Sequence, residues 1–162
     1  MAIVRELRTL QGEIDAYPDD ESLWLTPAGI SNSAGNLVLH LAGNLRHFVG
    51  STLGGSRYTR NRDAEFATRG VSRAQLRAEV EATIKDVDEA LSQLDTSGID
   101  SVFPLAIGQP PRRVTTGDFL VHLAVHLAYH LGQIDYHRRL LTPSRPTVDA
   151  LSITALPEPI VD

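Results

Sequence analysis

Apolar residues recur at helical spacing in four stretches of the chain. The first stretch repeats an apolar residue every three or four positions from Ile3 to Ile14, which predicts an amphipathic helix over about Ile3–Ala16. Similar patterns predict three more helices: from the capping residues Ser31–Ser33 to Gly54, over about Arg73–Leu94, and over about Gly117–Leu141. Four such segments without a run of alternating strands indicate an all-α fold, a four-helix bundle.

The segments between the predicted helices differ in composition. Trp24 lies between Pro18 and Pro27, and we expect a short turn that packs this indole against the bundle. Residues 97–114 hold glycines and prolines that prevent a continuous helix, and they leave room for a short hairpin. From about residue 142 further prolines predict a C-terminal tail. We therefore expect the chain, residues 1–162, to form a single domain with a tail.

The connection from Gly54 to Val71 is long enough to reach back along a helix of about 33 Å, since an extended residue spans roughly 3.3 Å. A crossover that leaves the second and third helices parallel is thus allowed but not required. Arginines are frequent between Arg57 and Arg77, and they would suit an anionic substrate if they lined a pocket. We favour the simpler interpretation, a solvated loop.

Composition and charge exclude several classes of function. The formal net charge of -5 disfavours nucleic-acid binding, which needs an excess of Lys and Arg on one surface. No stretch is long and apolar enough to cross a membrane, and residues 1–17 lack the apolar core of a signal peptide. The absence of Cys excludes Cys-ligated metals and a protein thiol nucleophile. We therefore expect a cytoplasmic protein that binds neither nucleic acid nor a membrane.

The histidines give the sharpest chemical signal. All six fall on the second and fourth predicted helices: His40, His47, His122, His126, His130 and His137. Two histidines four residues apart present their imidazoles on one helix face, and a third from a facing helix completes a three-nitrogen site for a divalent metal. Such a site leaves one coordination position free for chemistry.

Spacing alone does not decide which three histidines meet. His40 with His126 and His130 satisfies the spacing, and so does His47 with His122 and His126. If the two helices are antiparallel, His40 lies level with the neighbourhood of His130. A metal-free interaction protein, in which the histidines are hydrogen-bonded core residues, is the simplest alternative.

Two known kinds of metal site are disfavoured by missing residues. A di-iron carboxylate bundle needs Glu three residues before His, and none of the histidines has it. A zinc protease needs Glu directly after the first His of the pair, where Leu127 stands here.

Two motifs in this chain resemble the DinB/YfiT superfamily. They are Asn36-Leu37-Val38-Leu39-His40-Leu41 on the second helix and His126-Leu127-Ala128-Tyr129-His130-Leu131-Gly132-Gln133-Ile134 on the fourth. The pattern His-x-x-x-His-x-Gly-Gln is the more specific mark, and the order of the helices extends the resemblance over nearly the whole chain. The resemblance implies an up-down-down-up bundle, often a homodimer, with zinc or nickel held by His40, His126 and His130. Leu131 and Tyr129 stand where the family often has Arg and His, which affects the expected polarity of the substrate.

Members of this family resemble thiol-dependent S-transferases, isomerases and metal-dependent hydrolases. The resemblance therefore implies a metal-dependent enzyme that acts on a small-molecule substrate, with a low-molecular-weight thiol as a further cofactor. Asn44, one turn from His40, and Gln133 are candidate catalytic residues, although a packing role suits both equally well. The alternative is a non-catalytic metal-binding or ligand-sensing module, whose ion would be closed off by a fourth ligand such as His47 or His122.

Overall fold

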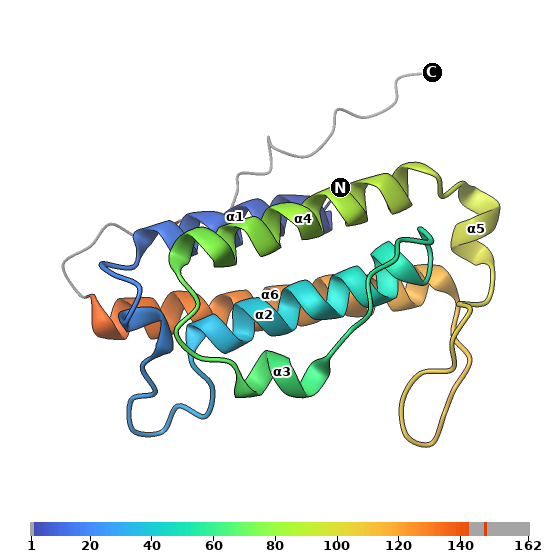
Figure 1. Cartoon of the computed structure of the whole chain (residues 1–162). Helices are drawn as coiled ribbons and strands as arrows, with labels where there is room; N and C mark the ends of the chain where they lie inside the picture. The colour runs from blue at the N-terminus through green and yellow to red at the C-terminus, as the bar shows by residue number, and fades with distance from the viewer. Residues whose placement is uncertain (1, 143–147, 149–162) are drawn as a thin grey trace.

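The computed structural model describes residues 2–142 and residue 148, and its regular elements are helical (Figure 1). The elements are α1 (Ala2–Ala16), η1 (Ser22–Trp24), α2 (Ala34–Leu45), η2 (Arg46–Ser51), α3 (Arg62–Ala67), α4 (Arg73–Ser92), α5 (Thr96–Asp100) and α6 (Thr116–Leu141). η2 continues α2 as a π-helical turn, so the two together form the second predicted helix.

The four long helices form a bundle in which α1 and α2 each pack against both α4 and α6. In Figure 1, α1 and α6 run in one direction, whereas α2 and α4 run in the opposite one. The order is therefore up-down-down-up, and the connection between α2 and α4 crosses back along the bundle. The expected all-α fold is confirmed.

Capping residues explain where the long helices begin. The Oγ of Ser33 accepts a hydrogen bond from the backbone N–H of Asn36 at 3.2 Å, which starts α2. Ser72 and Gln75 form the expected capping box at the start of α4. At the start of α6 the side chain of Thr115 accepts a hydrogen bond from the backbone N–H of Asp118. Each of these starts lies within about two residues of its sequence-based position.

Apolar faces of the four helices fill the core. Its fully buried members include Leu7 and Leu10 of α1, Leu41 of α2, Val80 of α4 and Leu127 of α6. Burial of such side chains away from water is the main force that holds the helices together.

Trp24 acts as the packing plug that its position between two prolines predicts. Its indole Nε1 donates to the carbonyl of Val71 at 3.0 Å. A Cβ on Gly35 would lie 2.7 Å from the indole ring, so only glycine permits this contact at the start of α2. The plug thereby holds the loop before α2 against the end of the crossover.

Two connections differ from expectation. The segment from Gly54 to Val71 contains α3, which was not predicted because six residues are too few to show helical periodicity. The segment 97–114 begins with the end of α5 and then forms antiparallel bridges at Val102–Thr115 and Ile107–Arg112, so the expected hairpin exists only as isolated pairs. The predicted tail lies outside the described residues, apart from its first residue and Val148.

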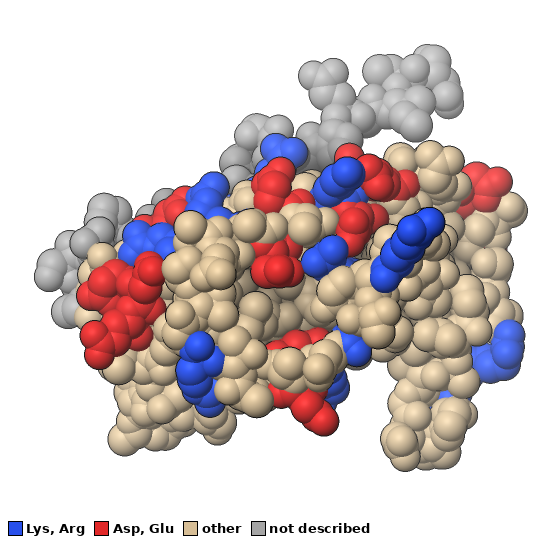
Figure 2. All heavy atoms as spheres, viewed as in Figure 1, with Lys and Arg blue, Asp and Glu red and all other residues tan. Residues whose placement is uncertain are grey.

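Charged side chains of both signs alternate on the face shown in Figure 2. Arg46 of η2 forms ion pairs with α4, and its Nε lies 2.8 Å from Oδ2 of Asp86. No helix in the described part of the chain is long and apolar enough to cross a membrane.

Candidate metal centre

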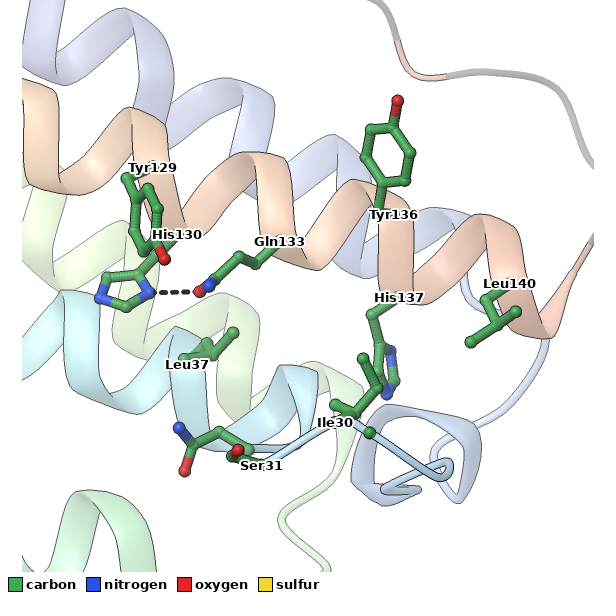
Figure 3. Close-up of a pocket in the computed structure, with 11 residues that line it drawn as sticks. Ile30, Ser31, Leu37, Tyr129, His130, Gln133, Tyr136, His137 and Leu140 are labelled. Carbon is green, nitrogen blue, oxygen red and sulfur yellow. Dashed lines mark hydrogen bonds between the residues drawn. The ribbon is translucent and has the colours of Figure 1, made fainter.

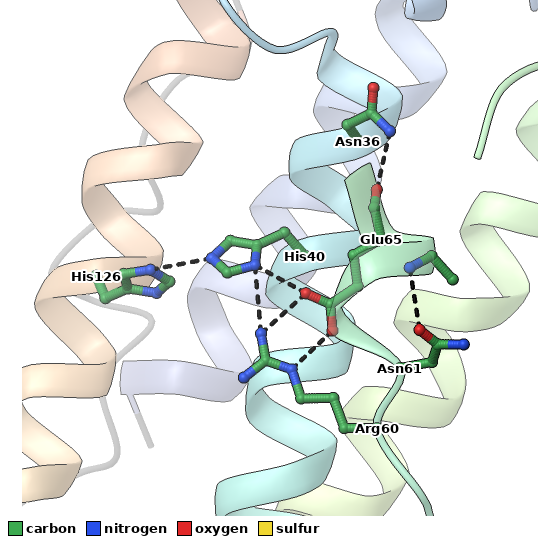
Figure 4. Close-up of polar contacts among 7 residues, drawn as sticks. Asn36, His40, Arg60, Asn61, Glu65 and His126 are labelled. Carbon is green, nitrogen blue, oxygen red and sulfur yellow. Dashed lines mark hydrogen bonds and ion pairs between the residues drawn. The ribbon is translucent and has the colours of Figure 1, made fainter. Parts of the chain in front are cut away.

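Three histidines from two facing helices converge on one point. His40 comes from α2, and His126 and His130 come from α6. One ring nitrogen of each lies within 4.8 Å of those of the other two, and the Nε2 atoms of His40 and His126 are 3.3 Å apart (Figure 4). Because α2 and α6 are antiparallel, His40 lies level with the pair that α6 presents at i and i+4. This group can hold a metal ion.

A buried carboxylate orients the His40 ring. Glu65 of α3 accepts a hydrogen bond from Nδ1 of His40 at 2.9 Å through its Oε2 atom. Since a carboxylate can only accept, Nδ1 carries the proton and Nε2 presents its lone pair toward His126 and His130. This is the carboxylate–histidine arrangement that supports metal ligands in proteins.

Arg60 neutralises Glu65 and completes this support. Its Nε donates to Oε1 of Glu65 at 2.7 Å, and its Nη2 donates to Oε2 at 2.9 Å (Figure 4). Burial alone would raise the pKa of Glu65, but the hydrogen bonds from Arg60 and His40 outweigh it and lower that pKa. Glu65 is therefore ionised at neutral pH.

The backbone of α3 is fixed against α2, which positions Glu65. The side-chain amide of Asn36 donates to the carbonyl of Glu65 at 2.8 Å and to that of Thr68 at 3.0 Å. A Cβ on Gly43 would overlap Oε1 of Glu65, so the carboxylate reaches His40 only because residue 43 lacks a side chain.

Gln133 orients the third histidine. Its Oε1 lies 2.7 Å from Nδ1 of His130, one turn away on α6 (Figure 3). An Nδ1–H that donates to this oxygen leaves Nε2 of His130 free for the group. Gln133 thus contacts a candidate ligand, as one of its two sequence-based interpretations requires.

Asn44 lies one turn from His40 and is almost fully buried. Its Oδ1 has no hydrogen-bond partner among the described residues. It makes no hydrogen bond to His40, His126 or His130 either, so its suggested catalytic role stays a prediction.

The protonation states of His126 and His130 on α6 also suit metal binding. Burial, followed by the proximity of His130 and His40, lowers the pKa of His126 to about 4. Burial likewise lowers the pKa of His130, against the opposing hydrogen bond to Gln133. Both rings are therefore neutral at pH 7, which is the form that binds metals.

The other three histidines have different surroundings. The ring of His122 stacks on Phe119, with centroids 5.8 Å apart, and that of His47 packs against Phe48. Among the described residues neither joins the three-histidine group, so the alternative set of His47, His122 and His126 is not brought together. Nδ1 of His137 accepts a hydrogen bond from the Tyr17 hydroxyl, 2.7 Å away, and its Nε2 donates to the backbone carbonyl of Leu25. His137 is therefore a hydrogen-bonded core residue.

Glu65 and Arg60 support the candidate centre, although neither was predicted from the sequence. Arg60 was assigned to a solvated loop, but its side chain is only 13% exposed. That assignment is wrong for Arg60, although Arg57 and Arg62 are exposed. A usable signal was present in Asn61, which caps α3 through the backbone N–H of Ala64 and so places Glu65 on a helix.

A pocket of about 550 Å³ adjoins the histidines (Figure 3). It lies between the loop before α2 and the C-terminal half of α6. Its lining residues are Gly29, Ile30, Ser31, Asn32, Leu37, Tyr129, His130, Gln133, Tyr136, His137 and Leu140. His130 and Gln133 therefore belong to the pocket wall as well as to the candidate metal centre.

The fold and this centre define a helical-bundle protein with a three-histidine group able to hold a metal ion. The sequence profile of the DinB superfamily matches residues 2–134. The chain belongs to the DinB superfamily.

A solved structure similar to this one is the crystal structure of a DinB-like protein from Bacillus cereus. The TM-score is 0.67 at 18% sequence identity, and 88% of each chain is covered. At that identity the similarity concerns the fold. No curated protein matches the chain.

Proposed function

We propose that the protein is a metal-dependent enzyme that acts on small molecules, with His40, His126 and His130 as the metal ligands. The observation that supports this most directly is the convergence of three imidazole nitrogens within 4.8 Å. The donor set fits a divalent ion of the zinc or nickel type, because imidazole binds both. When bound, such an ion supplies positive charge that lowers the pKa of a thiol or of water.

The chain's own residues prepare this chemistry. Glu65 holds the proton on Nδ1 of His40, and Gln133 does the same for His130, so that each ring presents Nε2 to the group. Arg60 compensates the charge of Glu65. No fourth His, Cys, Asp or Glu joins the group among the described residues, which favours an open, catalytic site over a closed structural one.

A low-molecular-weight thiol is the proposed nucleophile. The chain has no Cys, so the sulfur must come from a second small molecule. Both oxygens of Glu65 are occupied by Arg60 and His40, so this carboxylate is not free to act as a general base. Thiols ionise near pH 8.5 and need less help from a base than water does, which favours S-transfer over hydrolysis.

The test begins with metal content, measured by mass spectrometry on protein purified without an affinity tag. We expect about one ion per chain in the wild type, and loss of it in His130→Ala. His122→Ala, on the same helix but outside the group, is the matched control and should retain the ion. A wild type that neither contains metal nor takes up added Zn²⁺ or Ni²⁺ would refute the proposal.

Turnover is tested with thiols and an electrophile such as 1-chloro-2,4-dinitrobenzene. We expect thioether formation that depends on metal and is lost in His130→Ala but kept in His122→Ala.

The alternative proposal is a non-catalytic metal-binding or ligand-sensing module. The pocket beside His130 favours this ligand-sensing function, because a ligand bound there would contact His130, one of the proposed metal ligands. Stoichiometric metal without turnover of thiol or ester substrates would support this second function.

A further inference from the structure

We propose that the pocket beside His130 binds an uncharged, largely apolar ring system that carries a hydrogen-bond acceptor. This inference rests on the proposed function in one respect: it names the part of the substrate that lies next to the metal centre. The pocket itself is formed by protein side chains, so its ligand preference can be tested separately.

The position of the pocket connects it to the chemistry. His130 presents one edge of its ring to His40 and His126 and contributes to the pocket wall. Gln133 follows it along the same wall, toward Tyr136 and His137 (Figure 3). A molecule in the pocket therefore lies within one side chain of the candidate metal ligands.

The charge of the pocket selects against ions. None of the described residues that line it is Asp, Glu, Lys or Arg. His137 is neutral there, because burial lowers its pKa and its two ring nitrogens are already bonded to Tyr17 and to the carbonyl of Leu25. A carboxylate or sulfonate would lose its hydration without gaining a counter-ion from the described side chains that line the pocket, which is costly in an apolar site.

The walls suit a ring system. The aliphatic side chains of Ile30 and Leu37 line the pocket, and Tyr129 and Tyr136 of α6 add aromatic rings. Tyr136 is 74% exposed and Leu140 is 60% exposed, so a ligand would cover apolar surface that now faces water. A volume of about 550 Å³ is within the range of small-molecule sites.

One donor can orient the ligand at the end nearest the metal centre. The Oε1 of Gln133 is held by His130, whereas its amide nitrogen has no hydrogen-bond partner among the described residues. Its N–H groups can therefore donate to a carbonyl or nitro oxygen of the ligand. At the opposite end, the bonds of His137 to Tyr17 and Leu25 keep the wall in place.

The experiment compares two fluorescent probes of similar shape. N-phenyl-1-naphthylamine is neutral, and 8-anilino-1-naphthalenesulfonate carries one negative charge. We expect the neutral probe to bind the wild type about tenfold more tightly, since an unpaired buried charge is penalised. Equal or tighter binding of the sulfonate would overturn the proposal.

Variants locate the binding. Leu140→Glu places a charge at the pocket and should weaken the neutral probe at least tenfold, whereas Val121→Glu, on the same helix and 65% exposed, should have less than a twofold effect. Tyr136→Ala removes an exposed ring without disturbing the core, and it should weaken binding about threefold. Circular dichroism confirms that each variant is folded. Equal effects of Leu140→Glu and Val121→Glu would refute the assignment of the pocket.

A further variant separates this inference from the proposed function. His126→Ala removes a candidate metal ligand that does not line the pocket, so it should abolish metal binding but leave the neutral probe within twofold. If the wild type holds no metal but binds the probe in this way, the metal-dependent function fails and the pocket stands. If metal binds but the pocket variants have no effect on the probe, only the pocket proposal fails.

Discussion

Glu65 accepts a hydrogen bond from Nδ1 of His40 at 2.9 Å, and this contact joins a six-residue helix of the crossover to the candidate metal centre. We expect Glu65→Ala to weaken Zn²⁺ binding about 10- to 100-fold, the usual effect of losing a partner of a metal-bound histidine. Glu65→Gln keeps an acceptor and should lose less. Competition with a chromophoric chelator measures both affinities.

Glu89 supplies the control for this prediction. It is an exposed glutamate of α4, and Glu89→Gln should leave the affinity unchanged. Wild-type affinity in Glu65→Ala would mean that Glu65 only stabilises the position of α3.

Gly43 should be as necessary to the centre as Glu65. A methyl group at this position would overlap Oε1 of Glu65, so Gly43→Ala should displace the carboxylate and reduce Zn²⁺ affinity about tenfold. Gly132→Ala is the matched control, because its Cβ would meet nothing within 4 Å. That control should gain about 0.5–1 kcal/mol in unfolding free energy, since alanine favours helix over glycine. Similar metal affinities in both variants would contradict the steric role of Gly43.

The buried ion pair of Arg138 and Glu13 should contribute strongly to the free energy of unfolding. Arg138 Nε lies 2.5 Å from Glu13 Oε2, and both side chains are almost fully buried. Arg138→Met leaves the Glu13 charge buried alone and should cost about 3–5 kcal/mol in urea unfolding. The double variant Glu13→Leu with Arg138→Met should recover most of that loss. A double variant no more stable than Arg138→Met would show that packing, not charge, is the cause.

His137 should make the stability depend on pH. Burial lowers its pKa in the folded protein, so the unfolded chain takes up this proton first as the pH falls. The contribution of neutral His137 is therefore present above the unfolded pKa of about 6.5 and is lost as the pH falls below it. One proton gives a slope of up to about 1.4 kcal/mol per pH unit.

Urea unfolding at several pH values between 5 and 7 measures this slope in wild type and in His137→Gln. The variant is expected to be less stable at every pH, because it loses the bond from Tyr17, but its slope should be smaller. A slope equal to that of the wild type would assign the pH dependence to the other buried histidines.

Periodicity and capping residues predicted the parts of this protein that depend on local sequence. Ser33, Ser72 and Thr115 start their helices as expected, and the spacing of His126 and His130 placed both rings on one face of α6. The position of His40 beside this pair could be predicted by taking the second and fourth helices to be antiparallel. These features follow from positions three or four residues apart.

The support of the centre could not be predicted in this way. Glu65 reaches His40 across 25 residues, and the contact depends on the path of the crossover and on the missing side chain of Gly43. The pocket likewise depends on where the loop with Ile30 and Ser31 lies against α6. Such contacts are set by tertiary packing, which no local period encodes.

The crossover between α2 and α4 has a consequence for protein engineering. Parallel neighbouring helices need a connection as long as the bundle, and here the same connection carries Glu65 and Arg60. A redesigned bundle with a tight loop in its place would have to reverse α4, and it would lose the partner of His40 at the same time. The order of the helices and the support of the candidate metal centre therefore cannot be redesigned independently.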